Sequence, residues 1–360
     1  MQNVLAETVF SHVESPKKAA GRALGSIIEI IGFYLIKAWG HEYNTAIEKP
    51  LPEYANKDIL HNVEFTFHRS KLIKTLKTPT GTAITSTKLF NISALPGKFR
   101  KSETPRHLLK DGVIKNACTF AHSDLSFCNA YFALDKKNIL LYELQNAPFA
   151  MFECKRVGVE EGMKKGPQAI EKAKQGAYVA RAVSSVQRIR MKNGGIAGAV
   201  ESNGGIKVIG DYDKFVEKAI FEHDLEALAR FVLTVGIVSN HGNWFTSNNQ
   251  NKEMRVLAQS YDWLLFLTDE GLTKFLRDIF ITKSNECEAV KTAFAKSYKR
   301  GKSGNCFTKT RMDIDADRAL TRYFFQKDIR MQSWFNVIAP KGKTIDELKS
   351  MLNELAELEV

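Results

Sequence analysis

The chain has 360 residues, of which 44% are hydrophobic and 26% charged, a composition typical of globular proteins rather than of disordered or membrane-embedded chains. Its formal net charge of +12 favours a polyanionic partner. The five cysteines form no Cys-x-x-Cys pair, which argues against a disulfide framework or a zinc ribbon. Together with the lack of a basic-then-apolar signal sequence, this predicts a cytoplasmic location.

The first predicted element is a helix over residues 17–39. It is apolar nearly all round, which indicates a buried helix. Its most apolar stretch, residues 27–36, is interrupted by Glu29 and is too short to cross a membrane. A carboxylate in a buried helix is costly unless it is paired or binds a metal. Glu29 is therefore either ion-paired with a nearby Lys or Arg, or part of a functional site.

A basic segment follows this helix. From Phe65 to Ser102 there are eight Lys and Arg residues and no acidic residue. Pro and Gly residues interrupt the segment, which predicts loops and short strands. Such a run of positive charge suits a phosphate backbone. We expect an inserted basic segment near residues 65–116.

The next part alternates between apolar runs and turn residues. It predicts a meander of three strands, Leu125–Leu134, Ile139–Gln145 and Phe149–Arg156. A helix over Gln168–Arg190 and a buried strand over Phe231–Ser239 follow. The order of helix, three-stranded meander, helix and strand predicts an α/β (α+β) fold with a mixed sheet flanked by helices.

The C-terminal region, residues 246–360, is predicted to be mostly helical and packed on a core formed by residues 1–245. Between Ala289 and Arg311 it has seven basic residues and no acidic one, with aromatic residues interleaved. This composition is typical of nucleic-acid contacts. Thr344 and Glu347 form a capping box at the start of an amphipathic last helix. We expect this region to serve DNA binding, dimerisation or both.

One pair of residues carries a chemical prediction. Glu153 and Lys155 lie two positions apart at the end of a predicted strand and therefore point to the same face. A carboxylate that can hold a divalent metal, beside a lysine that can steer a water, suits phosphodiester hydrolysis. The same spacing recurs at Glu347 and Lys349, but there it lies in a helix, where i and i+2 do not share a face.

With the element order around it, the Glu153-x-Lys155 triplet resembles the PD-(D/E)xK nuclease superfamily and, within it, the type II restriction endonucleases. The resemblance covers residues 17–240. It implies a Mg²⁺-dependent, site-specific endonuclease acting on double-stranded DNA, with Glu153 as a metal ligand and Lys155 at the attacking water. It also gives Glu29 the place of a glutamate found on the first helix of many members. Gln175 and Tyr178 resemble a Gln and a Tyr on the helix after the Lys in repair nucleases of the superfamily.

The family pattern further requires an Asp at the start of the second strand, as a metal ligand. Asp135 begins the second strand of the predicted meander, at the end that meets Glu153. Asp124 faces Glu153 more nearly if Asn146–Pro148 is only a bulge and the last two strands are one. The sequence leaves both open.

The pattern has further implications for partners. Cleavage of both DNA strands implies two active sites and hence a homodimer. Gly301-Lys302-Ser303 lacks the earlier glycine of a phosphate loop, so no nucleotide cofactor is predicted. The basic residues expected at DNA are Lys71, Lys74, Lys77, Lys98, Arg100, Lys101, Arg156, Lys299, Arg300, Lys302, Lys309 and Arg311.

Two other functions fit the sequence. The protein could be a repair-type nuclease of the same fold. It could also be a nucleic-acid-binding protein without catalysis, in which Glu153 and Lys155 form only an exposed ion pair of little energetic value.

Overall fold

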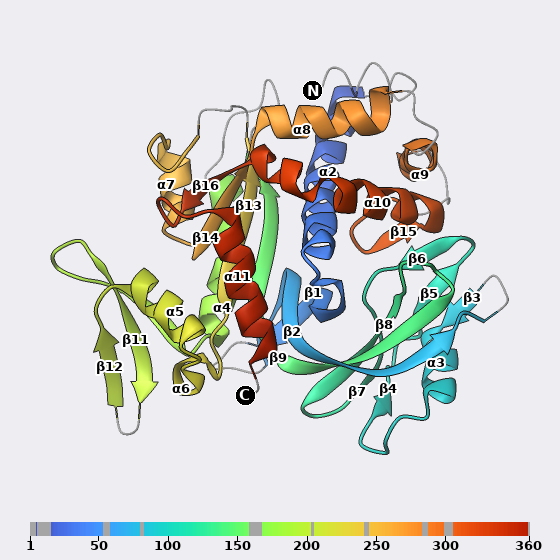
Figure 1. Ribbon diagram of the computed structural model, residues 1–360, viewed down its shortest axis with the longest axis horizontal. Helices are drawn as coiled ribbons and strands as arrows, with labels where there is room; N and C mark the ends of the chain where they lie inside the picture. The colour runs from blue at the N-terminus through green and yellow to red at the C-terminus, as the bar shows by residue number, and fades with distance from the viewer. Residues whose placement is uncertain are drawn as a thin grey trace.

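The computed structural model describes Leu5 and residues 16–52, 58–79, 83–157, 168–202, 205–240, 245–282, 287–298 and 305–358. A nine-stranded mixed sheet forms its centre, with helices on both faces (Figure 1). The central strands, in spatial order, are β1 (Thr45–Pro52), β2 (Leu60–Lys77), β9 (Asn138–Arg156), β13 (Leu233–Ser239), β14 (Trp263–Leu267) and β16 (Phe335–Ala339).

The connections in this sheet follow the chain. β1, β2 and β9 pair antiparallel in succession, whereas β13 pairs parallel to β9. A parallel neighbour needs a crossover connection, and helix α4 (Gln168–Val183) lies within it. Helix α2 (Pro16–Ala38) precedes β1. The order of helix, three antiparallel strands, helix and parallel strand is therefore present.

Helices α2 and α4 cover opposite faces of β9. On one face Gly32 of α2 lies so close that a Cβ there would be 2.5 Å from the Cys154 sulfur. On the other face Gly176 of α4 lies against Met151 and Glu153. Residues 151 and 153 alternate with 154 across the strand, as the pleat requires. α2 is long and apolar enough to cross a membrane, but 76% of its most apolar window is buried inside the protein, so it is a core helix.

The predicted three-stranded meander is wrong in its boundaries. Its first strand is β8 (Ser126–Phe132), and its second and third strands are the single strand β9. The predicted turn at Asn146–Pro148 is an irregularity within β9, where Pro148 pairs with His68 and the register shifts. Proline is tolerated at such bulges. The antiparallel trio of the core is thus β1, β2 and β9.

The basic segment is an insertion between the second and third of these strands. The insertion occupies residues 78–137, so residues 65–77 of the predicted segment belong to β2 instead. Three of its strands form a small sheet with β15 from the C-terminal region, whereas β8 and two further strands extend the nine-stranded sheet; both parts lie on the right of Figure 1. The elements of this part are β3 (Ala83–Thr85), α3 (Ser86–Ser93), β4 (Arg100–Lys101), β5 (His107–Lys110), β6 (Val113–Lys115), β7 (Cys118–His122), β8, and β15 (Arg311–Asp313).

A second small sheet follows α4. The helix predicted to reach Arg190 ends at Val183, and residues 186–190 form an edge strand. This three-stranded sheet and two short helices lie on the left of Figure 1. They are β10 (Val186–Arg190), β11 (Ile196–Ser202), β12 (Gly205–Ile209), α5 (Tyr212–Phe221) and α6 (Leu225–Leu228).

The described part of the C-terminal region is mostly helical, as expected, but β14 and β16 complete the central sheet and belong to the core. The capping box at Thr344 and Glu347 is confirmed at the start of α11 (Ile345–Glu357). The other helices are α7 (Lys252–Ala258), α8 (Asp269–Leu276), α9 (Glu288–Tyr298) and α10 (Ile314–Met331), with short turns η1 (Glu42–Asn44), η2 (Arg277–Ile281) and η4 (Gln332–Trp334).

Candidate active site: a carboxylate cluster where two strands part

Glu153 and Lys155 lie side by side near the end of β9. The Lys155 ammonium is 2.6 Å from Glu153 Oε1. Glu153 is only 7% exposed, whereas the Lys155 side chain is 34% exposed. The pair is therefore open to solvent on the lysine side and closed on the carboxylate side, unlike an ordinary surface ion pair.

A third side chain, Glu64 of β2, meets this pair. The backbone pairing of β2 with β9 ends at Phe65 and Phe152. Beyond this pair the two strands are joined by hydrogen bonds between side chains and backbone. The Cys154 N–H donates to Glu64 Oε2 at 2.8 Å, and the Glu64 N–H donates to Glu153 Oε2 at 3.4 Å. Two carboxylates from antiparallel strands are thus held together where the strands part.

Glu64 is an unusually unfavourable carboxylate. It is 4% exposed, and its Oε1 accepts no hydrogen bond within the described part of the chain. Burial raises its pKa to about 8, Lys309 and Lys155 oppose the shift, and the nearby Glu29 and Glu153 add to it. Additional positive charge nearby would stabilise the ionised form of Glu64.

Lys309 enters the cluster from the opposite end of the chain. Its ammonium lies 3.3 Å from Glu64 Oε1, 3.3 Å from Glu29 Oε2 and 3.6 Å from Glu48 Oε1. Burial lowers its pKa, but the three carboxylates together outweigh this and raise it. The sequence placed Lys309 at DNA; in the structure it is a buried partner of Glu29 and Glu64.

We name the set Glu29, Glu48, Glu64, Glu153, Lys155 and Lys309 the carboxylate cluster. It has four carboxylates and two ammonium groups, so its formal charge is negative when all are ionised. Sequence reasoning placed Glu29, Glu153 and Lys155 in one site, and the structure brings these three into the same cluster. It missed Glu48 and Glu64.

Neither aspartate proposed for the site lies in it. Asp135 is exposed in the turn before β9, where its carboxylate accepts from the Lys137 N–H. β9 begins at Asn138, 15 positions before Glu153 and on the order of 50 Å away along an extended strand. Asp124 is exposed in the turn before β8, and its carbonyl accepts from Asn146 in the middle of β9. Asp135 fails because the second and third predicted strands are one long strand, whose start is far from Glu153. The Asp124 alternative was right that Asn146–Pro148 is only an irregularity within one strand, but Asp124 lies beside Asn146, seven positions before Glu153.

Helix α4 fixes the position of Glu153. A Cβ at Gly176 would lie 2.8 Å from Met151 Cε and 3.0 Å from both Cβ and Oε2 of Glu153. Only a glycine lets the helix backbone approach the carboxylate this closely. Gln175, the preceding residue, is exposed and donates no hydrogen bond to Glu153 or Lys155 within the described residues. The structure therefore gives Gln175 no hydrogen bond to the pair that the resemblance assigned it to.

The basic residues expected at DNA are dispersed. Lys74 donates to the carbonyls of Ile92 and Ser93 at the end of α3, and Lys98 pairs with Glu143 at 3.0 Å. Lys71 and Lys77 are exposed on β2, and Arg100 and Lys101 on β4. Arg156 ends β9 and Arg311 is exposed on β15. Lys299, Arg300 and Lys302 lie outside the described residues.

The cluster has the donor chemistry for Mg²⁺, although it is not a ready-made metal cage. No three Asp, Glu, His or Cys side chains of the described ranges are arranged for a metal ion, and Lys155 lies between the two carboxylates. Yet Glu64 and Glu153 offer buried carboxylate oxygens, the ligands that hard cations prefer. Glu64 Oε1 accepts no hydrogen bond from the described residues, although the Lys309 ammonium lies 3.3 Å away, and the pKa of Glu64 is raised; both observations fit a site that accepts a further cation.

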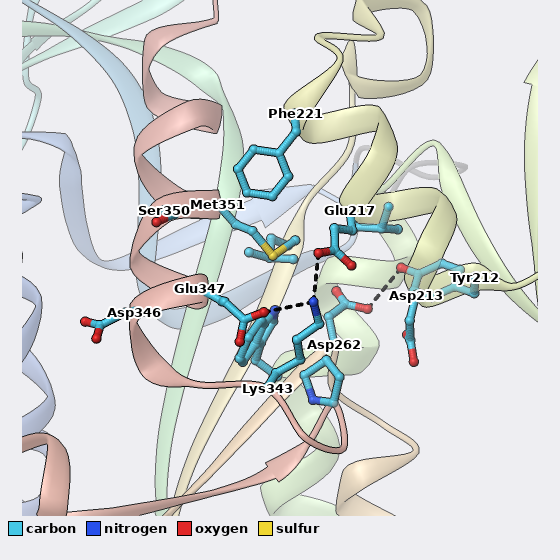
Figure 2. Close-up of a pocket in the computed structure, with 14 residues that line it drawn as sticks. Tyr212, Asp213, Glu217, Phe221, Asp262, Lys343, Asp346, Glu347, Ser350 and Met351 are labelled. Carbon is cyan, nitrogen blue, oxygen red and sulfur yellow. Dashed lines mark hydrogen bonds and ion pairs between the residues drawn. The ribbon is translucent and has the colours of Figure 1, made fainter.

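A cavity of about 310 Å³ between α5 and α11 is the other candidate site (Figure 2). Its charged groups are already paired. Lys343 lies 2.7 Å from Glu217 and 2.9 Å from Glu347, and the Tyr212 hydroxyl donates to Asp262 at 3.0 Å. Because these pairs leave no unsatisfied charge comparable to that of Glu64, the carboxylate cluster is the stronger candidate.

Comparison of the chain with protein-family models, with curated proteins and with solved structures gives no match.

Proposed function

We propose that the protein is a Mg²⁺-dependent nuclease that hydrolyses phosphodiester bonds in double-stranded DNA. More finely, we propose a site-specific endonuclease of the type II restriction class. The observation that carries this proposal is the meeting of Glu64 with Glu153 and Lys155 at the point where β2 and β9 part. The burial of both carboxylates argues against the alternative of an exposed ion pair.

The order of elements supports the same assignment. α2, the antiparallel strands β1, β2 and β9, then α4 and the parallel strand β13 follow the order expected of a PD-(D/E)xK core. In this scheme Glu64, on the second strand, takes the place of the family's Asp. Glu29 on the first helix reaches the site through Lys309.

The proposed roles follow from charge and exposure. Glu64 and Glu153 would hold the metal. When bound, Mg²⁺ lowers the pKa of a coordinated water and neutralises charge on the scissile phosphate. Burial lowers the pKa of Lys155, but Glu153 and Glu64 outweigh burial and raise it. Lys155 therefore remains an ammonium, and from its solvent-exposed side it donates a hydrogen bond that orients the attacking water.

The test is a plasmid incubated with the protein in Mg²⁺ or in EDTA. Discrete fragments in Mg²⁺ alone would support a site-specific enzyme, and a smear a repair-type nuclease. Glu153→Gln and Lys155→Ala should each lower the cleavage rate by about 10³-fold or more while leaving DNA binding in EDTA intact. Lys349→Ala, in the helical copy of the triplet, is the matched control and should cleave normally. Full activity in both site variants would overturn the assignment.

Two further features stay predictions. Cutting both strands in one event requires two sites, so we expect a homodimer, which sedimentation with and without DNA would measure. The cytoplasmic location also remains an expectation from the cysteine usage.

A further inference from the structure

A second group of charges lies beside the carboxylate cluster and has the opposite sign. A cavity of about 430 Å³ opens between β5, β6, α9 and the segment that leads into β15. Four basic side chains line it: Lys110, Lys115, Lys296 and Arg311. We name it the hairpin pocket, after the hairpin of residues 306–313 that forms one wall.

Two of these cations directly oppose each other. Lys115 and Arg311 are partners in the antiparallel register of β6 and β15. Side chains of direct partners share a face about 5 Å apart at Cβ, and like charges at that distance repel. Burial lowers the pKa of Lys115, and the nearby Arg106 and Arg311 lower it further, while Cys118 and Glu48 oppose the shift without reversing it. The folded chain thus holds Lys115 and Arg311 together although their positive charges repel each other.

The carboxylates near the pocket do not neutralise it. None of the four cations forms an ion pair with any described residue. Asp313 is occupied as the N-cap of α10, where it accepts from the backbone N–H groups of Asp315 and Ala316. Asp111 is exposed in the tight turn between β5 and β6. Four basic side chains thus face two carboxylates in the lining of the pocket, which leaves an excess of positive charge.

The hairpin joins this pocket to the carboxylate cluster. Asn116, next to Lys115, donates its side-chain amide to the Lys309 carbonyl at 2.8 Å and its backbone N–H to the Thr310 carbonyl at 3.0 Å. This fixes the hairpin tip, from which Lys309 reaches Glu29 and Glu64. Arg311 is two residues further along, so its Cα lies within about 7 Å of that of Lys309. A polyanionic chain could bridge the two sites.

We propose that the hairpin pocket binds a backbone phosphate of the nucleic-acid substrate, near the phosphate that is cleaved. Arg311 supplies a planar fork for two phosphate oxygens, and the lysines supply point charges. The nucleic-acid part of this assignment rests on the proposed function, whereas the phosphate chemistry rests on the pocket alone. The repulsion between Lys115 and Arg311 is relieved when the anion binds.

The experiment compares Lys115→Gln/Arg311→Gln with Lys341→Gln, an exposed lysine beyond the edge strand β16, all in a Glu153→Gln background that cannot cleave. Duplex affinity is measured by fluorescence anisotropy in EDTA between 50 and 200 mM salt. The double variant should bind about 10- to 100-fold more weakly at low salt, with the slope of log K against log salt reduced by about 1 to 2. The control should match the parent.

Thermal unfolding distinguishes loss of binding from loss of structure. Removing a like-charge pair should leave the Tm of the free protein unchanged or slightly raised, so weaker binding at an undiminished Tm supports the proposal. An unchanged affinity and salt slope would overturn it. Protection by inorganic phosphate that the double variant loses, without any change in duplex binding, would also overturn it and indicate a free-phosphate site.

The outcomes separate this proposal from the proposed function. If the double variant loses duplex affinity but the wild-type protein cleaves no DNA in Mg²⁺, the pocket stands and the nuclease assignment fails. If the wild-type protein cleaves DNA and the double variant binds the duplex as its Glu153→Gln parent does, the nuclease assignment stands and the pocket fails.

Discussion

Helix α2 contributes to two groups of charged residues: Glu29 belongs to the carboxylate cluster, and Lys37 belongs to another group near the end of the helix. Tyr34 and Lys37 of α2, with Glu42, Lys136 and Asp317, form what we name the Asp317 cluster. Lys37 lies 2.9 Å from Glu42 and 3.3 Å from Asp317, and the Tyr34 hydroxyl donates to Asp317 at 2.8 Å. Glu29 and Lys37 are eight positions apart, about 12 Å along the helix.

The two clusters differ in how well their charges are compensated. In the Asp317 cluster two ammonium groups meet two carboxylates, and Asp317 is fully buried. Burial would raise the pKa of Asp317, but Lys37 and Lys136 together lower it to about 2. In the carboxylate cluster the pKa of Glu64 is instead raised to about 8. The compensated charges hold α2 to α10, whereas the carboxylate cluster has two more carboxylates than ammonium groups, which fits the cation site proposed above.

The largest effect is expected from Asp317→Asn. Lys37 and Lys136 would lose their shared carboxylate while buried, which should lower the free energy of unfolding by about 3–5 kcal/mol. Urea unfolding followed by circular dichroism measures it. Asp315→Asn, whose pair with Arg318 on the same helix is exposed, should cost less than about 1 kcal/mol. Equal losses in the two variants would contradict the comparison.

The pH dependence of this effect has a defined sign. Because the pKa of Asp317 is lowered from 3.8 to about 2, its stabilisation is complete above pH 4 and is lost as the pH falls from about 4 to 2. The advantage of wild type over Asp317→Asn should shrink over that range.

The next effect is stabilisation by Mg²⁺. A cation that binds the folded protein at 100 times its Kd should add about 2.7 kcal/mol, seen as a rise in Tm. The rise should vanish in Glu64→Gln/Glu153→Gln and persist in Glu217→Gln, whose carboxylate is paired in the other cavity. A rise that survives in the double variant would place the cation elsewhere.

Glu64→Gln should reverse the usual sign of removing a buried charge. The pKa of Glu64 is raised from 4.5 to about 8 in the folded protein, so the folded state binds the proton more tightly than the unfolded state. The wild-type protein therefore loses stability as the pH rises from about 4.5 to 8. When the pH is raised from 5 to 9 in EDTA, the free energy of unfolding of Glu64→Gln should increase by about 1–3 kcal/mol relative to that of wild type. This is less than the full pKa shift would give, because the charges of the cluster interact with one another. A difference that does not vary with pH would show that Glu64 is compensated like Asp317.

The smallest effect tests the contact between α4 and Glu153. Gly176→Ala should cost about 1–2 kcal/mol and displace Glu153, lowering cleavage by about 10- to 100-fold. Gly25→Ala in α2, where nothing lies within 4 Å, should instead raise stability by about 0.5–1 kcal/mol and leave cleavage unchanged. Thermal unfolding and plasmid cleavage measure both variants. Normal cleavage by Gly176→Ala would show that the close approach is not needed.

Local patterns predicted the local elements. The apolar helix α2, the strand that ends in Glu153 and Lys155, the strand β13 and the capped helix α11 all follow from periodicity and capping within a few residues. The pairing of β2 with β9 could not be predicted from local patterns, because 60 residues are inserted between the two strands. The strands were therefore assigned to a meander of near neighbours.

The missed site residues follow from the same cause. Glu64 lies in Val63-Glu64-Phe65-Thr66-Phe67, an alternation of apolar and polar residues that signals a strand, but the prediction counted part of it as basic segment. Once β2 was missed, no carboxylate on a second strand was available except Asp135 and Asp124. Lys309 has no local signal, because its partners lie hundreds of residues earlier.

The distant origin of Lys309 has a consequence for synthesis. A chain made from its N-terminus acquires Glu29, Glu48 and Glu64 first, then Glu153 and Lys155, and Lys309 last. Until residue 309 has emerged, the first-made carboxylates lack the ammonium that lies among three of them in the finished protein. A fragment that ends before the hairpin thus carries Glu29, Glu48 and Glu64 without the ammonium that pairs with all three, so completion of the chain is itself a step in assembling the carboxylate cluster.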